Sequence, residues 1–165
     1  MTDTPSVSTL AVPDGRTRPE FHHVGIQTND LDNSVRWYTE FHGAEVVWTL
    51  NEFSELTRRR LPGIRELTEI SLGHVRLHLF ERVGKPFEPA ESAVGFQHFC
   101  FGVSAPEQLE VIRRRWIELY DSGRYTFAVD EPPTEIVNDD GVLSFYTYDV
   151  NGLEFEFTYV PGDAS

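Results

Sequence analysis

The feature that most constrains the fold is an internal duplication, in which the same order of strands and helix occurs twice. In the first half, residues 21–28 (FHHVGIQT) alternate as a strand does, and Asp30 can cap a helix that follows. Three more strands are predicted over residues 45–50, 65–72 and 75–81, separated by turn residues. The first half is therefore predicted to run strand, helix and three strands.

The second half repeats this order. Residues 95–103 (GFQHFCFGV) predict a strand, and Ser104 with Glu107 three residues later predicts a capping box that opens a helix. A four-stranded half-sheet with one helix leaves one face uncovered and needs its twin to complete a core. The remaining strands of the second half are predicted over residues 125–129, 143–148 and 153–159. The sequence thus predicts an α+β fold of two βαβββ modules that enclose a cavity.

The predicted boundaries divide the chain into five segments. Residues 1–19 are rich in Thr, Ser and Pro and lack the basic start and apolar stretch of a signal peptide, so a mobile tail is expected there. The modules are expected over residues 20–83 and 94–160, joined by a linker over 84–93. A short C-terminal tail is expected over residues 161–165.

Charge and cysteine content exclude several classes of function. Asp and Glu number 27 against 14 Lys and Arg, and the net charge of -13 repels nucleic acid and anionic membranes. The single cysteine, Cys100, cannot form an internal disulfide, and no apolar run is long enough to span a bilayer. A cytoplasmic location is therefore expected. Cys100 itself is expected to be a small buried residue rather than a nucleophile.

Four polar side chains occupy equivalent places in the two modules. His23 and His98 lie in the first strand of their modules, and alignment of VRLHLF with LEFEFT places His78 opposite Glu156. Any one of these histidines alone could be a hydrogen-bonded polar group without further function. Together they predict a site for a divalent metal in the cavity, because imidazole nitrogen and carboxylate oxygen are ligands for iron, manganese, cobalt, nickel and zinc.

Two stretches closely resemble the vicinal-oxygen-chelate family of glyoxalase, bleomycin-resistance and dioxygenase proteins. They are residues 23–44 (HVGIQTNDLDNSVRWYTEFHGA) and 149–157 (DVNGLEFEF). The resemblance implies a metal held by the first-strand histidine and by a last-strand residue of each module, a small-molecule substrate with neighbouring oxygens, and a homodimer. Bleomycin-binding relatives lack the metal ligands, so a complete set favours an enzyme. The implied ligands are His23, His78, His98 and Glu156.

The resemblance leaves the reaction open, and an extradiol-type dioxygenase of a catechol-like substrate is the first hypothesis. Such enzymes hold iron(II) with two histidines and one glutamate, so Fe(II) is the cofactor expected first, with Mn, Ni, Co or Zn as alternatives. Their catalytic histidine would fall near Asn138, where this chain has none. His78 is then a candidate acid-base group if it does not bind the metal, and Tyr146 is a further catalytic candidate.

A proton-moving lyase or isomerase of the glyoxalase or epimerase type is the alternative. Relatives of that type usually carry Glu or Gln where this chain has His78, but Glu154 shares a strand face with Glu156 and could act as the base. A third hypothesis is a resistance protein that sequesters an aromatic drug without turnover. A fosfomycin-modifying transferase would need a cationic pocket, for which strand parity supports Arg76 alone.

Three residues are expected to contact the substrate. Arg76 shares the strand face of His78, and Tyr148 shares that of Tyr146. His74 is expected at the rim of the cavity, whereas His22 and His42 are expected to be polar groups of the surface or core.

Overall fold

The computed structural model describes residues 21–83, 98–139 and 141–162. The predicted N-terminal tail and the predicted linker lie outside the described residues, as do the last three residues of the predicted C-terminal tail.

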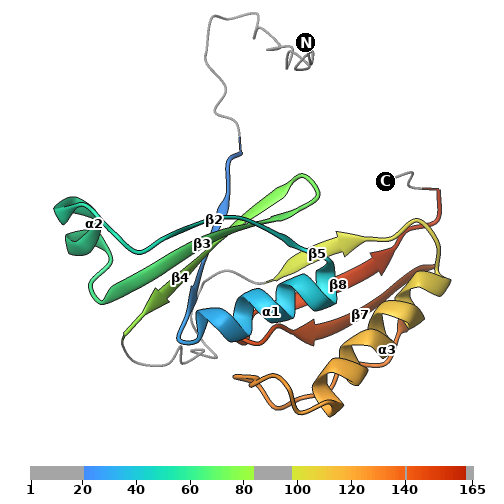
Figure 1. Ribbon diagram of the computed structural model, residues 1–165. Coiled ribbons are helices and arrows are strands. Elements are labelled where there is room, and N and C mark those ends of the chain that lie inside the picture. The colour runs from blue at the N-terminus through green and yellow to red at the C-terminus, as the bar shows by residue number, and fades with distance from the viewer. Residues whose placement is uncertain (1–20, 84–97, 140, 163–165) are drawn as a thin grey trace, which may run out of the picture.

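Two four-stranded sheets and three helices form the described structure (Figure 1). Their strand orders are β1-β4-β3-β2 and β5-β8-β7-β6. The pairs β1–β4 and β5–β8 are parallel, and the other pairs are antiparallel. The predicted α+β fold of two βαβββ modules is confirmed. The first module holds β1 (Val24–Thr28), α1 (Leu31–His42), β2 (Glu45–Leu50), α2 (Glu55–Arg60), β3 (Ile64–Leu72) and β4 (Val75–Arg82). The second module holds β5 (Phe99–Gly102), α3 (Glu107–Asp121), β6 (Val137–Asp139), β7 (Val142–Tyr148) and β8 (Glu154–Tyr159).

The first helix forms where the sequence predicts it. Asp30 caps α1 by accepting a hydrogen bond of 2.9 Å from the backbone N–H of Asn33. Gly43 ends the helix with a φ of 70°, a left-handed conformation that glycine adopts without strain. Tyr38 and Phe41, three residues apart on one side of the helix, are buried.

The predicted capping box of the second helix is wrong. It requires a helix that starts directly after Ser104, but α3 starts at Glu107 and the described structure shows no side-chain cap hydrogen bond there. The side chain of Gln108 reaches back instead and accepts from the backbone N–H groups of Ser104 and Ala105. These donors are therefore satisfied from inside the helix.

The strand predicted over residues 125–129 is also wrong, because other groups satisfy its backbone. The Asn33 side chain bonds both the N–H and the carbonyl of Thr126, and the N–H of Ala128 donates to Val150. The second strand of the module along the chain is instead β6, which lies at the edge of the sheet and outside the predicted strands. The predicted alternation thus reflects packing against α1 rather than a sheet ladder.

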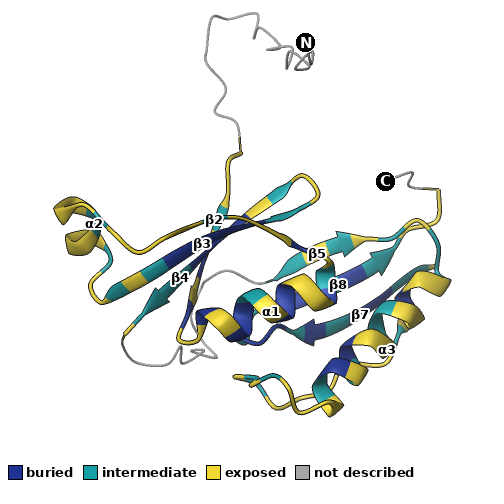
Figure 2. Ribbon diagram, viewed as in Figure 1, coloured by how far each residue is buried: buried dark blue, intermediate teal, exposed yellow. Residues whose placement is uncertain are grey.

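Helix α1 packs against both modules. It contacts β3 and β4 of its own sheet, and the Trp37 ring stacks on Phe155 of β8 with 6.3 Å between centroids. Buried positions accordingly lie along α1 and the strands around it (Figure 2). Tyr38 also donates a hydrogen bond of 2.8 Å to the buried carboxylate of Asp149. The apolar rows of the sheets thus face the helices, and the alternate polar rows face away from them.

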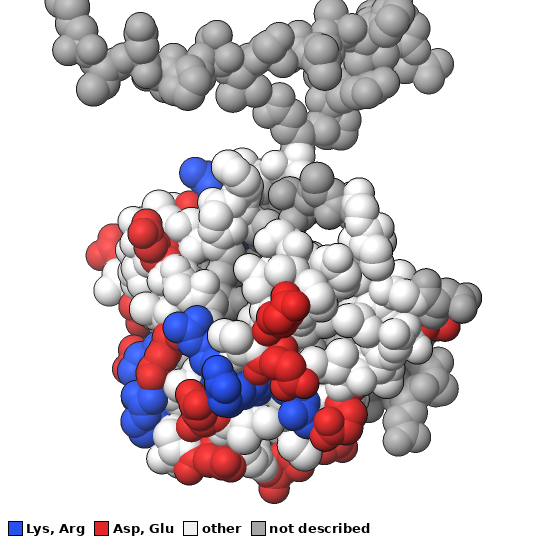
Figure 3. Space-filling view, turned by 90° about the vertical axis from the view of Figure 1, so that its right-hand side faces the viewer, with Lys and Arg blue, Asp and Glu red and all other residues white. Residues whose placement is uncertain are grey.

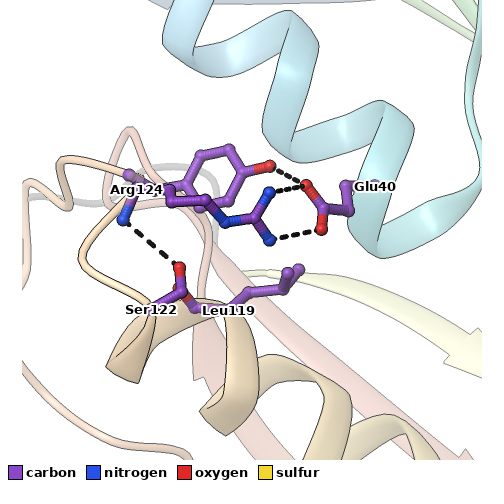
Figure 4. Close-up of polar contacts among 5 residues, drawn as sticks. Glu40, Leu119, Ser122 and Arg124 are labelled. Carbon is purple, nitrogen blue, oxygen red and sulfur yellow. Dashed lines mark hydrogen bonds and ion pairs between the residues drawn. The ribbon is translucent and has the colours of Figure 1, made fainter.

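Exposed charges add a second link between the modules. Arg124 donates to the Glu40 carboxylate of α1 at 2.9 Å, and the Tyr125 hydroxyl bonds the same carboxylate (Figure 4). Because these groups are exposed, solvent screens them and they contribute little to stability. Basic and acidic side chains are interspersed on the face shown in Figure 3. None of the described helices is long and apolar enough to cross a membrane.

Candidate metal site

Strand register agrees with the predicted equivalence of His78 and Glu156. Parallel pairing of β1 with β4 brings Gly25 opposite His78, and parallel pairing of β5 with β8 brings Cys100 opposite Glu156. His23 comes two residues before Gly25, and His98 comes two residues before Cys100. By strand alternation each histidine therefore lies on the same face of its sheet as His78 or Glu156. The four predicted ligands therefore hold matching places in the two modules.

The first module brings its two predicted ligands into contact. The His23 ring stacks on that of His78 with 3.7 Å between centroids and 12° between planes. His22 joins them, since its Nδ1 lies 2.8 Å from Nδ1 of His23, and one ring nitrogen of each of the three histidines lies within 4.8 Å of the others. Burial lowers the pKa of His23, and the neighbouring His78 adds to the effect. His22 was expected only as a polar surface or core group.

Glu69 is a site residue that the sequence analysis missed. It lies on β3 opposite His78, is only 1% exposed, and its Oε2 lies 2.7 Å from Nε2 of His78. Burial raises the pKa of Glu69, but the hydrogen bond with His78 and the charge of Arg76 outweigh it and leave the pKa below its usual value. The available signal was its alternation with Leu67 and Ser71 on one strand face.

The second module also brings its predicted ligands into contact. His98 Nε2 lies 3.2 Å from Glu156 Oε2, and the Tyr146 hydroxyl donates to Glu156 Oε1 at 3.2 Å. Burial raises the pKa of Tyr146, and the Glu156 charge raises it further, so the phenol stays a hydrogen-bond donor. Tyr146 therefore holds a predicted ligand in the orientation that the structure shows.

The expectation that Cys100 is buried is wrong. The residue is exposed because it lies on the face of β5 that points away from the helices. Desolvation of the thiol raises the pKa of Cys100 to about 11, with Glu156 adding to the effect. The thiol is therefore protonated at neutral pH, which agrees with the expectation that it is no nucleophile.

The predicted substrate contacts lie on or beside these two faces. Tyr148 pairs with Glu154 across β7 and β8, on the face of Glu156. Arg76 lies on the face of His78, with its guanidinium 3.7 Å from the Glu69 carboxylate. His74 is exposed in the turn between β3 and β4.

His42 lies in the core rather than at the site. Its ring packs against those of Phe41, Phe101 and Phe155, and within the described part of the chain its Nε2 has no hydrogen-bond partner. Burial lowers the pKa of His42 to about 3, and the charge of Arg115 adds to the effect. The imidazole is therefore neutral in the folded protein at neutral pH.

The two ligand pairs do not form one cluster within the chain. His22, His23 and His78 form the only group of three or more His, Cys, Asp or Glu side chains whose ligand atoms lie close together among residues 21–83, 98–139 and 141–162. Because α1 packs against both modules on the apolar side of their sheets, the polar rows face away from that shared core. A site that joins all four ligands thus remains a prediction.

The side chains that are present suit a divalent metal. Each pair offers imidazole nitrogen, and the second pair adds carboxylate oxygen, which is the donor set of iron, manganese, nickel, cobalt and catalytic zinc sites. The buried Glu69 carboxylate adds negative charge beside the first pair, and its Oε1 has no hydrogen-bond partner among the described residues. The half-exposed Arg76 balances that charge in part, and a metal cation nearby would balance it further.

Two modules of this topology, each with a histidine before its first strand and a polar residue in its last, define a class of two-module α+β proteins. The sequence model of the Glyoxalase/Bleomycin resistance protein/Dioxygenase superfamily matches residues 20–157, so the chain belongs to this superfamily. The family resemblance stated from the sequence is thereby confirmed. Comparison with curated proteins found no match.

The solved structures that are similar to this chain include the following three. A glyoxylase/bleomycin resistance protein/dioxygenase domain from Frankia sp. is 19% identical, covers 87% of this chain and 98% of its own, and has a TM-score of 0.66. A lactoylglutathione lyase from Agrobacterium tumefaciens is 21% identical (87% and 96% covered, TM-score 0.54). The fosfomycin resistance protein FosX from Listeria monocytogenes, solved with Mn(II) and sulfate, is 13% identical (88% and 96% covered, TM-score 0.58). These likenesses show a shared fold.

Proposed function

We propose that the protein is a metal-dependent enzyme that binds a small molecule through two neighbouring oxygen atoms. The observation that carries the proposal is the matched placement of two ligand pairs, each on the polar face of its module's sheet. A duplicated fold has no structural need for this match, because the apolar faces alone form the core. The proposed ligands are His23, His78, His98 and Glu156.

The first candidate reaction is dioxygenation of a catechol-like substrate with iron(II). A bound metal supplies a Lewis acid that polarises substrate oxygens, and iron(II) adds the capacity to activate dioxygen. Tyr146 orients Glu156 through its hydrogen bond, and Tyr148 and Glu154 present a hydroxyl and a carboxylate on the same face. These groups can bind the hydroxyls of a phenolic ring and hold its plane.

The second candidate is a proton-moving lyase or isomerase, which the position of Glu154 favours. This residue lies two positions before Glu156 on the same strand face and is partly exposed. A carboxylate beside a substrate oxygen that a metal polarises can remove a proton from the adjacent carbon. A phosphonate substrate is less well matched, because Arg76 already has the Glu69 carboxylate as its ionic partner.

We further propose that the complete site is built by two chains, the first module of one facing the second module of the other. The support is that each chain carries two separate ligand pairs on faces turned away from its own core. A second copy related by two-fold symmetry can complete both pairs at once. Light scattering coupled to size-exclusion chromatography should give the mass of a dimer, and a monomer that binds one metal ion per chain would contradict it.

Activity is tested with defined metal forms of the protein. Iron(II) is restored anaerobically and oxygen uptake is followed with a panel of catechols, while the nickel, zinc and manganese forms are assayed with hemithioacetals. Oxygen uptake that needs both iron and catechol supports dioxygenation, and hemithioacetal turnover supports the lyase. Stoichiometric ligand binding without metal and without turnover would replace both with a sequestering protein.

A further inference from the structure

We propose that Glu69 is a positioning residue that fixes His78 as the tautomer protonated at Nε2 and so leaves Nδ1 for the metal. The inference deepens the proposed function and rests on it for the role of Nδ1. A histidine whose proton is held by a buried carboxylate is prepared to act as a ligand.

The contact between the two side chains determines the tautomer. Glu69 Oε2 lies 2.7 Å from His78 Nε2, and both side chains are nearly buried, at 2% and 10% exposure. An ionised carboxylate offers only acceptors, so the hydrogen between the two atoms belongs to Nε2. In the neutral imidazole the lone pair is then on Nδ1.

Ring packing fixes the plane of the same imidazole. His23 stacks on it at 3.7 Å, and Trp48 meets it edge to face at 5.0 Å between centroids. Phe80 lies beside it at 6.1 Å. With the plane fixed by its neighbours, the hydrogen bond to Glu69 decides which nitrogen faces outward.

The second module repeats the arrangement with the polarity reversed. Register places Glu69 opposite His78 and Tyr146 opposite Glu156, so the two supporting residues are equivalent. The donor His78 meets an acceptor, and the acceptor Glu156 meets a phenol that donates at 3.2 Å. Each supporting residue has the polarity that its predicted ligand requires, which packing alone does not explain.

The second oxygen of Glu69 keeps negative charge beside the imidazole. Oε1 is buried, lacks a hydrogen-bond partner among the described residues, and lies 3.7 Å from Arg76 Nη1. Arg76 supplies an opposite charge but no hydrogen bond to that oxygen, and a buried acceptor without a hydrogen bond is costly for the fold. A metal on Nδ1 lies across the ring from this carboxylate, so the two act on each other through the imidazole, whose basicity the negative charge raises.

Metal affinity of two variants and a control gives the first test. Glu69→Leu removes the acceptor and should weaken metal binding by roughly 10- to 100-fold, the usual effect of losing such a partner. Glu69→Gln keeps a carbonyl acceptor of similar shape and should recover most of that loss. Glu110→Gln, on the exposed side of α3, should bind metal as the wild type does.

The tautomer itself gives a second test that needs no metal. In the metal-free protein, two-bond ¹H–¹⁵N correlations should show His78 protonated at Nε2, and Glu69→Leu should shift it toward a mixture. Circular dichroism establishes that each variant is folded. A His78 protonated at Nδ1 in the wild type, or a tautomer and a metal affinity both unchanged in Glu69→Leu, would overturn the inference. The expected tautomer in a wild type that binds no metal supports the positioning by Glu69 and contradicts the proposed function instead.

Discussion

His23 and Glu156 lie on the polar faces of their sheets, so removing either side chain leaves the apolar core intact. We predict that His23→Ala or Glu156→Ala abolishes stoichiometric metal binding while the chain stays folded. Equilibrium dialysis with metal analysis measures the first effect, and circular dichroism the second. Full metal retention in both variants would exclude the ligand set.

The site could be predicted from the sequence only in part. His78 and Glu156 could be matched because the duplication aligns their strands, and register agrees with that match. Glu69 could not be singled out, because its partner is brought opposite by antiparallel pairing of β3 with β4, which sequence periodicity does not specify. His22 lies inside the strand predicted over residues 21–28, where alternation places it on the opposite face from His23, but β1 begins only at Val24 and the alternation does not extend to His22.

The buried imidazole of His42 should make stability depend on pH. Its pKa is about 3 in the folded chain against 6.5 as the ordinary value, so between these pH values the unfolded chain binds a proton that the folded chain does not. The free energy of unfolding should therefore fall as pH falls from 6.5 toward 3, by at most about 1.4 kcal/mol per pH unit. His42→Phe should reduce this slope in urea titrations. Equal slopes in the variant and the wild type would refute the assignment.

At the scale of elements, the contact between α1 and the turn before β8 joins the two modules. Asp149 is fully buried and accepts from the Tyr38 hydroxyl and from the backbone N–H groups of Asn151 and Leu153. Tyr38→Phe removes one of these bonds to a buried carboxylate and should cost about 2 kcal/mol of unfolding free energy. Chemical denaturation measures this loss. An unchanged midpoint and slope would show that the bond contributes nothing.

The elements that could be predicted are those whose sequence carries its own period and ends. Asp30 and Gly43 mark both ends of α1, and the alternation over β2 and β4 places those strands within a residue. The wrong strand over residues 125–129 falls where a side chain from elsewhere satisfies the backbone, as Asn33 does for Thr126. Such a bond joins positions 93 residues apart, which local patterns do not report.

At the scale of the whole molecule, the position of α1 decides how the site can be completed. The helix fills the space between the apolar faces, so each chain presents its two ligand pairs separately. Duplication predicts two equivalent half-sites from sequence, but whether they meet within one chain or between two depends on packing between modules. Tertiary contacts such as that of Trp37 with Phe155 set that packing.

The most direct test is complementation between two defective chains. One chain carries His23→Ala and His78→Ala, the other carries His98→Ala and Glu156→Ala, and the two are co-expressed with different tags so that mixed dimers can be isolated. We predict that neither chain alone binds metal and that each mixed dimer binds one metal ion, because one of its two sites then has all four ligands. Metal binding by either defective chain alone, or mixed dimers without metal, would contradict a four-ligand site shared between two chains.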